Sequence, residues 1–340
     1  MHNNDDVAEG ERMLDQYGRK IEYLRISVTD RCNLRCVYCM PEEGVEQVSH
    51  SEILTFDEMI RVCRTCAKLG ITKVKLTGGE PLVRKGLGSL LRSIKELEGI
   101  EQVTLTTNGV LLAGQIDELA DAGLDAVNIS LDTLDRTQYR EFTRRDELEA
   151  ALEGLKAALQ YPDIRVKVNC VALHGENESQ WVPLADIARE RPVDVRFIEM
   201  MPIGLGKDYP LSSQEIVYGA LKEVYGEAQF LTGDFGNGPA VYAQFPGFCG
   251  KIGFISAVSH KFCGSCNRIR LTAEGFLKPC LQYSSGIDLR TVLRSGGGEK
   301  ELEEMLKNVI FEKPRCHQFT AEGNQEADEL EQKRMSSIGG

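Results

Sequence analysis

Three cysteines near the start of the chain are spaced closely enough to share one metal centre. Cys32, Cys36 and Cys39 form a C-x3-C-x2-C motif. Iron–sulfur clusters are held by Cys thiolates, usually four of them. Three thiolates on a four-iron cluster would leave one iron open to another molecule, as a catalytic zinc ion keeps an open position. We therefore predict a cluster here, with a structural zinc site using His50, or plain core thiols, as the alternatives.

A second triplet of cysteines lies in the C-terminal third of the chain. Cys263, Cys266 and Cys280 form a C-x2-C-x13-C motif, with Cys249 and His260 as candidate fourth ligands by sequence only. Taken alone, this spacing fits a zinc ribbon and an iron–sulfur site equally well. Because the first triplet favours a cluster, we expect a second cluster at this triplet as well.

The remaining five of the eleven cysteines are expected to be bystanders. Cys63 and Cys66 lie on the apolar stripe of a predicted helix, where free Cys behaves as a small hydrophobe. Cys170 falls within a predicted strand, and neither Cys249 nor Cys316 carries a clear signal of its own. The first dozen residues lack an apolar run and do not resemble a secretory signal, so we expect cytoplasmic protein with reduced thiols.

A glycine-containing turn could bring a ligand close to the backbone. The sequence Thr77-Gly78-Gly79-Glu80-Pro81 follows a β-rich run, and the Glu80 carboxylate can accept hydrogen bonds from an ammonium group. An ordinary turn between a strand and a loop is the alternative.

Basic residues recur inside the predicted strands, where a buried charge is costly unless it is paired. An anionic ligand such as a phosphate is one partner, and salt bridges with acids such as Asp132 or Glu199 are the alternative. Two of these bases, Arg268 and Arg270, would share one face of a strand just after Cys266. The strand-borne bases are Arg25, Lys75, Lys167, Arg268 and Arg270.

The elements that must position these residues alternate between strand and helix. Six runs rich in Val, Ile, Leu and Thr predict strands at residues 21–28, 73–77, 103–107, 126–131, 165–173 and 193–199. Amphipathic periodicity predicts helices at residues 55–69, 86–97, 113–122, 148–159, 179–189 and 212–224. This alternation indicates a parallel sheet covered by helices, either doubly wound or curled into a barrel, with functional residues at the carboxyl ends of the strands.

After about residue 230 the pattern changes to short strands joined by turns. We expect strands at residues 239–245, 251–257, 268–273 and 276–281 in a small antiparallel layer, followed by helices at 287–293 and 300–310.

Composition and charge exclude several classes of protein. The chain has 340 residues, 42% of them hydrophobic, and a net charge of −12. Residues 1–16 carry five acids and one base, and residues 321–334 carry five acids and two bases, so the ends hold more than half of that charge. No basic domain is present to bind a nucleic acid polymer, and no apolar stretch is long enough for a membrane span. Motifs of P-loop, Rossmann and G-x-S-x-G enzymes are absent.

Together, the first Cys triplet with Tyr38 before its last Cys and the Gly-Gly-Glu-Pro turn resemble the radical S-adenosylmethionine superfamily. The second triplet, the run Asn267-Arg268-Ile269-Arg270 beside it and the terminal Gly339-Gly340 are similar to the GTP 3′,8-cyclase family within it. The resemblance implies an α/β fold, a partial (β/α)6 TIM-type barrel with a small C-terminal antiparallel β layer. The expected plan is a mobile acidic segment at 1–18, the barrel at 19–230, a second-cluster and substrate layer at 231–320 and a polar tail at 321–340.

The resemblance also implies cofactors and roles for individual residues. Cys32, Cys36 and Cys39 would bind a [4Fe-4S] cluster that chelates S-adenosylmethionine, and Cys263, Cys266 and Cys280 a second [4Fe-4S] cluster that binds the substrate, GTP. The positions that match contacts with S-adenosylmethionine are Tyr38, Gly79, Ser130 and Met201. Those that match contacts with GTP are Arg25, Lys75, Thr106, Lys167, Arg268, Ile269 and Arg270. Gly339 and Gly340 would reach into the active site.

The implied reaction is the first step of molybdenum cofactor biosynthesis. A 5′-deoxyadenosyl radical takes hydrogen from ribose C3′ of GTP, and the product is 3′,8-cyclo-7,8-dihydro-GTP. The implied partners are a flavodoxin- or ferredoxin-like electron donor, the next enzyme, which rearranges the cyclised GTP to cyclic pyranopterin monophosphate, and a second copy in a homodimer. Another two-cluster radical enzyme that modifies a peptide, or a zinc-binding module without enzyme activity, are the alternatives.

Overall fold

The computed structural model describes residues 13–45, 48–233, 235–319, 330, 331, 333 and 335–338. Most of the acidic N-terminal segment and most of the polar tail, including Gly339 and Gly340, lie outside these residues, so the expectations for them stay predictions.

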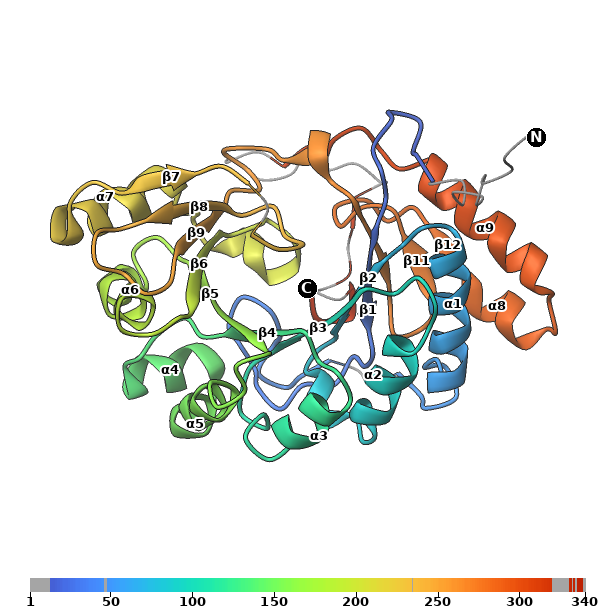
Figure 1. Ribbon diagram of the computed structural model, residues 1–340, viewed down its shortest axis with the longest axis horizontal. Coiled ribbons are helices and arrows are strands. Elements are labelled where there is room, and N and C mark those ends of the chain that lie inside the picture. The colour runs from blue at the N-terminus through green and yellow to red at the C-terminus, as the bar shows by residue number, and fades with distance from the viewer. Residues whose placement is uncertain are drawn as a thin grey trace, which may run out of the picture.

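Six parallel strands, each followed by helical segments, form the centre of the fold (Figure 1). The strands are β1 (Tyr23–Ser27), β2 (Lys73–Thr77), β3 (Gln102–Thr107), β4 (Ala126–Ser130), β5 (Arg165–Ala172) and β6 (Asp194–Glu199). The helices are α1 (Phe56–Lys68), α2 (Leu87–Lys95), α3 (Ile116–Asp121), α4 (Arg136–Thr143), α5 (Leu148–Ala158), α6 (Trp181–Glu190) and α7 (Gln214–Tyr225). The prediction of a partial (β/α)6 barrel is confirmed.

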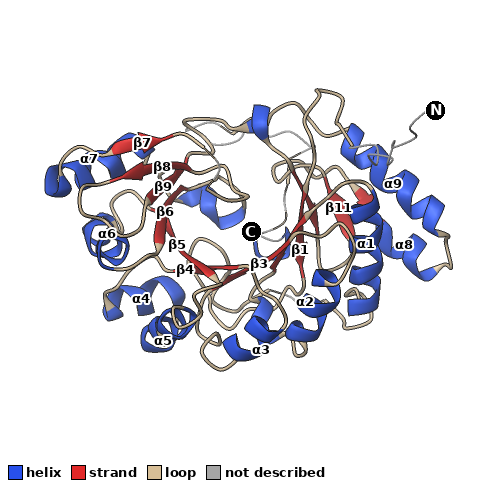
Figure 2. Ribbon diagram, in the orientation of Figure 1, coloured by secondary structure: helices blue, strands red, loops and turns tan. Residues whose placement is uncertain are grey.

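The curled sheet has helices on its outer side, as Figure 2 shows. Apolar side chains of the strands alternate with polar ones, and the apolar set packs against the apolar faces of the helices. Helix α1 begins with the capping box that the sequence predicts. The Thr55 hydroxyl accepts a hydrogen bond from the Glu58 N–H, and the Glu58 carboxylate accepts one from the Thr55 N–H. Its Cys63 and Cys66 are fully buried, as is Cys170 in β5, which confirms them as core residues.

The C-terminal strands do contain the expected antiparallel pairs, but they extend the barrel sheet at both of its edges. On one side the order continues from β6 to β9 (Ile252–Ile255), β8 (Val241–Gln244) and β7 (Gln229–Leu231). On the other it continues from β1 to β10 (Arg268–Leu271), β11 (Phe276–Lys278) and β12 (Ile287–Asp288). Because β9 and β10 pair in parallel with β6 and β1, these barrel strands are not left with open edges.

The chain crosses from one edge of the sheet to the other through residues 256–267. It leaves β9 at the carboxyl ends of the parallel strands and enters β10 at their amino ends, because both pairings are parallel. The crossing therefore runs the full height of the barrel opening. Helices α8 (Leu289–Arg294) and α9 (Glu299–Phe311) then pack beside α1, and α10 (Met335–Ile338) returns with Ile338 buried beside Ile203 and Phe319.

The sequence prediction lacked four elements of the observed fold, which are α4, β7, β12 and α10. Helix α4 has a strongly polar composition with few apolar residues, and the other three are two to four residues long, too short for a hydrophobic period to show. None of the helices in the described part of the chain combines the length and apolar character needed to cross a bilayer.

Two glycines within helices should respond in opposite ways to replacement by alanine. A Cβ on Gly154 of α5 would clash with the carbonyl oxygen of Gly109, in the loop after β3, whereas a Cβ on Gly219 of α7 would meet nothing within 4 Å. We expect Gly154→Ala to lower the free energy of unfolding by about 1–3 kcal/mol, because the helix must move away from the loop. Gly219→Ala should raise it by about 0.5–1 kcal/mol through helix propensity. Urea denaturation of the two variants checks this, and stabilisation by both would contradict the close packing of α5.

Candidate active site

A cavity of about 390 Å³ lies inside the barrel, which is a size typical of small-molecule sites. Its lining is strongly basic although the whole chain carries a net charge of −12. Among the described residues, nine Arg and Lys side chains line it, against the three carboxylates of Glu80, Asp132 and Glu199. The nine are Arg19, Arg25, Lys75, Arg165, Lys167, Arg196, Arg268, Arg270 and Lys313.

Three of these bases form a row across neighbouring strands. Arg25 on β1 is in register with Arg270 on β10 and with Lys75 on β2, so all three point to the same side of the sheet. Burial lowers the pKa of Lys75 and of Arg270 well below their ordinary values, and the neighbouring cations lower both further. An arrangement of like charges a strand apart favours an anionic ligand.

The two nearby acids, Asp132 and Glu199, accept hydrogen bonds from groups outside this row. Asp132 accepts from the Tyr38 hydroxyl at 2.6 Å and from the Val171 N–H at 2.8 Å. Glu199 accepts from the N–H groups of Val258 and Ser259.

Lys167, another of the predicted bases, has a carboxylate partner. It lies 3.4 Å from the Asp194 carboxylate and donates to the Tyr242 hydroxyl and the Phe235 carbonyl. Burial lowers its pKa to about 8.

The loop that carries the first triplet follows β1 and docks on the end of α4. Its Arg35 and Val37 N–H groups donate to the carbonyls of Thr143 and Phe142. Arg144, in the left-handed conformation at the end of α4 (φ 54°), donates to the carbonyls of Arg35 and Met40. The unpredicted helix α4 is thus what holds this loop in place.

Gly78 and Gly79 let their own turn lie close to the backbone of the neighbouring loop, whereas the sequence suggested the approach of a ligand. The Gly79 and Glu80 N–H groups donate to the carbonyls of Thr29 and Arg31, both at 2.8 Å, and a Cβ on either glycine would clash with these carbonyls. The turn after β2 is therefore bonded directly to the backbone that precedes Cys32.

Glu80 is held as an acceptor beside the first triplet. Its carboxylate accepts from the Thr107 hydroxyl and the Asn108 N–H, both at 2.7 Å, and from the Leu82 N–H at 3.0 Å. Burial raises its pKa to about 7, although the three hydrogen bonds act in the opposite direction. Asn108 also donates weakly to the Cys32 sulfur, at 3.9 Å.

The chemistry of the first triplet fits a cluster. Its three thiols line the cavity, and burial raises the pKa of Cys32 to about 11 and that of Cys36 well above its ordinary value. Buried thiols of this kind become thiolates when a metal centre binds them. The three sulfurs do not all lie within 4.8 Å of one another, which is too wide for one ion such as zinc. His50, the only candidate fourth ligand, is exposed.

The second triplet lies at the opposite end of the strands from the first. Cys266 lies two residues before Arg268, the first residue of β10, which is in register with Tyr23, the first residue of β1. The β10–β11 hairpin returns Cys280 to the same end, since Arg270 faces Lys278. Our expectation that functional residues gather at the carboxyl ends is thus wrong for this triplet, because parallel pairing with β1 makes β10 start at the amino end. The bases lie between the two triplets, within the strands.

Lys313 and Arg19 fasten the second triplet to the C-terminal segment. The buried Lys313 ammonium donates to the carbonyls of Arg268 (2.9 Å) and Pro279 (2.5 Å), one on each arm of the hairpin. Arg19 donates to the Cys263 and Arg315 carbonyls. Despite burial, Lys313 and the neighbouring arginines lower the pKa of Cys266 to about 7, which favours the thiolate needed for metal binding.

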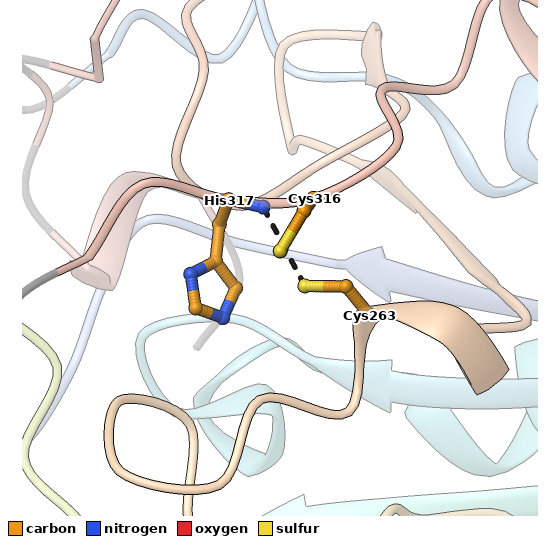
Figure 3. A group of neighbouring side chains, drawn as sticks. All are labelled: Cys263, Cys316 and His317. Carbon is orange, nitrogen blue, oxygen red and sulfur yellow. Dashed lines mark hydrogen bonds between the residues drawn. The ribbon is translucent and has the colours of Figure 1, made fainter.

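Neither suggested fourth ligand of the second triplet lies at it. Cys249 is exposed in the turn between β8 and β9, and His260 contacts the Glu215 carboxylate. Two residues without a sequence signal lie there instead: Cys316 and His317, beside Cys263 (Figure 3).

The structure brings nearly all the predicted site residues to one cavity. Both triplets, all four positions expected to contact S-adenosylmethionine and six of the seven expected to contact GTP line it. Ile269 does not, because it alternates with Arg268 and Arg270 and is fully buried in the hydrophobic core. Sequence reasoning missed Arg196, although it is a strand-borne base like the others, with Gly253 beside it leaving space for its side chain. It also missed Arg165 on β5, and Arg19 and Lys313, which lie outside the strands.

Comparison with known proteins identifies the class. The Radical SAM superfamily profile matches residues 26–188, and the profile named Molybdenum Cofactor Synthesis C matches residues 193–319. The crystal structure of Streptococcus suis SuiB bound to S-adenosylmethionine has a similar fold, with a TM-score of 0.61 at 16% identity, covering 86% of this chain and 66% of that one. The chain belongs to the radical S-adenosylmethionine superfamily.

Within the superfamily the match is more specific. The chain is 46% identical to the GTP 3′,8-cyclase of Clostridium perfringens over 331 residues, which cover 96% of this chain and 100% of that protein. It is 45% identical to the GTP 3′,8-cyclase of Heliobacterium modesticaldum over 332 residues, with the same coverage. It is therefore a member of the GTP 3′,8-cyclase family.

The buried Lys75 should make folding stability depend on pH in a predictable direction. Because its pKa is lowered in the folded chain, the unfolded chain holds the extra proton, and stability rises with pH from the lowered value toward 10.5. We expect Lys75→Met to raise the free energy of unfolding at pH 7 by about 1–3 kcal/mol, since it removes an amine that is costly to bury. The variant should also flatten this rise.

Urea denaturation of the chain without nucleotide, between pH 7 and pH 10, measures both effects. Lys73→Met is the matched control, since Lys73 lies on the same face two residues earlier but pairs with Glu22 at 3.7 Å. The control should change stability by less than about 1 kcal/mol. Equal pH slopes in wild type and Lys75→Met would contradict the buried, charged position of Lys75.

Proposed function

We propose that this chain converts GTP to 3′,8-cyclo-7,8-dihydro-GTP, the first step of molybdenum cofactor biosynthesis, in the cavity of the barrel. The observation that carries the proposal is the layout of the site: one Cys triplet at each end of a single cavity, with a row of buried cations between them. The five-residue strand β1 spans this distance, so the triplets lie on the order of 13 Å apart or more. That separation leaves room for a nucleotide between them.

The first triplet would hold a [4Fe-4S] cluster and S-adenosylmethionine. Cys32, Cys36 and Cys39 supply the thiolates, and the Glu80 carboxylate can accept from the ammonium group of the cofactor. Bound there, the cofactor supplies a carbon radical that can take a hydrogen atom from ribose C3′. The positions proposed to contact it at this end are Tyr38, Gly79, Ser130 and Met201.

Tyr38 is oriented for this role by its contact with Asp132. The 2.6 Å hydrogen bond fixes the ring next to Cys39, and the Val171 N–H fixes the carboxylate in turn. Burial raises the pKa of Asp132 to about 6, and the two hydrogen bonds oppose that rise. The pair therefore sets the shape of the cavity wall beside the cluster loop.

The second triplet and the cations would hold GTP. Cys263, Cys266 and Cys280 supply thiolates to a second [4Fe-4S] cluster that binds the guanine. The triphosphate meets the basic row, in which arginine can bind phosphate oxygens in pairs. The proposed contacts are Arg25, Lys75, Thr106, Lys167, Arg268 and Arg270, with Ile269 limited to its backbone.

Lys75 neutralises charge without the paired geometry of an arginine, so it acts on the triphosphate as a point charge. Arg196 extends the same set, because it lines the cavity from β6 and is held by its hydrogen bond to Asn169 at 2.9 Å.

The chain would also exclude water and stray hydrogen donors from the reaction. The barrel wall encloses the site, and the C-terminal segment reaches it, since Met335 lines the cavity and Ile338 is buried. Gly339 and Gly340 follow directly, and we include their entry into the active site in the proposal.

The proposed reaction also involves other proteins. An electron donor of the flavodoxin or ferredoxin type would reduce the first cluster, and the next enzyme would rearrange the product to cyclic pyranopterin monophosphate. Two copies of the chain would form a homodimer, which the mass of the protein in solution tests directly.

Loss of a proposed ligand should abolish cleavage of S-adenosylmethionine. We expect Cys36→Ala to form no 5′-deoxyadenosine in an anaerobic incubation with GTP, S-adenosylmethionine and reductant, because the first cluster loses a thiolate. Cys63→Ala is the control: it removes a fully buried thiol that lies in the core of α1, so cleavage should continue. Wild-type chain that makes 5′-deoxyadenosine but no product derived from GTP would overturn the assignment of the substrate.

Loss of a proposed triphosphate contact should weaken GTP binding and leave both clusters intact. We expect Arg270→Ala to raise the Kd for GTP about 10- to 100-fold, the effect of one hydrogen bond to a charged group. Arg136→Ala, which removes an exposed arginine paired with Asp146, should leave the Kd unchanged. Equilibrium binding and the visible spectrum of the clusters report the two quantities separately, and an unchanged Kd in Arg270→Ala would place the phosphates elsewhere.

A further inference from the structure

Three potential ligands of a single metal ion meet beside the second triplet. The sulfurs of Cys263 and Cys316 and one ring nitrogen of His317 all lie within 4.8 Å of one another. Figure 3 shows the two thiols facing each other with the imidazole alongside. This is the one such group of His, Cys, Asp and Glu side chains among the described residues.

The spacing of these atoms suits one ion rather than a cluster. Zn–S bonds of about 2.3 Å in a tetrahedron place two sulfurs roughly 3.8 Å apart. The sulfurs of Cys263, Cys266 and Cys280 do not meet the 4.8 Å limit as a group, as expected for ligands of a larger centre.

His317 provides a second, independent indication. His317 is 8% exposed, and its buried Nε2 makes no hydrogen bond of normal geometry, although the imidazole interacts with the backbone of Ala257. Its Nδ1 accepts a long hydrogen bond of 3.3 Å from the Phe319 N–H. A buried imidazole nitrogen without a hydrogen bond of normal geometry, close to two thiols, is in position to bind a metal ion.

The backbone around the three groups is already fixed. The His317 N–H donates to the Cys263 sulfur at 3.5 Å, and the Tyr283 hydroxyl donates to the Cys316 carbonyl at 3.0 Å. Arg19 joins the two chain segments through the carbonyls of Cys263 and Arg315. Binding would therefore need little rearrangement of the chain.

We propose that Cys263, Cys316 and His317 form a site for one divalent, borderline-soft ion such as Zn²⁺. The ion is bound by two thiolates and one imidazole nitrogen, the two thiol protons go to solvent, and a fourth position stays open to water. Because the proposed function assigns Cys263 to the second cluster, the ion and that cluster exclude each other. Zinc bound here keeps the substrate end of the cavity from being loaded with iron and sulfide.

Zinc binding to the full-length, cluster-free chain tests the site itself. We expect one tightly bound Zn²⁺ per chain under anaerobic conditions, with its affinity reduced by at least about 100-fold in Cys316→Ala. Cys280→Ala is the matched control, since it removes a thiol of the second triplet that is not a ligand of this site, and it should bind zinc like the wild type. Unchanged binding in Cys316→Ala, or equal losses in both variants, would overturn the site.

Iron content then tests whether the zinc ion and the second cluster exclude each other, separately from the proposed function. Reconstitution with iron and sulfide should give about eight irons per chain without zinc and about four after zinc loading. Cys316→Ala should recover the higher value in the presence of zinc. Eight irons together with retained zinc would overturn the exclusion, whereas failure to reach eight irons without zinc would count against the second cluster and leave the zinc result standing.

Discussion

The repulsion between buried cations inside the barrel determines much of the remaining structure. Nine cationic side chains face one cavity, and three of them lie in register on neighbouring strands. Desolvation and mutual repulsion both act against this arrangement, as the lowered pKa values of Lys75 and Arg270 show. The two acids that could have relieved it, Asp132 and Glu199, accept hydrogen bonds from other groups instead. A polyanionic substrate would relieve this repulsion on binding.

The position of β10 converts this charge arrangement into a site with two ends. Had the C-terminal strands formed a separate layer, the second triplet would have no fixed height relative to the first. Parallel pairing of β10 with β1 fixes the register of Arg268 and Arg270 and places Cys266 at the amino end of the strands. Lys313 then joins the two arms of the hairpin that carries Cys266 and Cys280. One pairing thus sets the distance between the triplets and the positions of the cations.

Much of this could be predicted from the sequence, because the signals are local. The alternation of β-rich runs and amphipathic segments predicts the six βα units, and the Cys spacings predict two metal centres. The bases Arg25 and Lys75 could be recognised because charged residues are rare inside buried strands. The side of the sheet on which the second triplet lies depends on a pairing between distant strands, and nothing local encodes it. Cys316 and His317 meet Cys263 only through the tertiary fold, so no spacing could have revealed them. Helix α4 was missed because its composition is polar, although it holds the first cluster loop.

The pairing of β1 with β10 also has a consequence for how the protein is made. Leu24 and Ile269 are neighbours in the sheet but are 245 residues apart in the chain. During synthesis the six βα units can assemble while β1 still presents a free edge, because its partner has not yet been translated. Contacts of such long range are slow to form, so the nascent barrel passes through a stage with an exposed edge and an open interior. The first Cys triplet is complete at that stage and the second is not, so the order of synthesis favours filling the two metal centres one after the other.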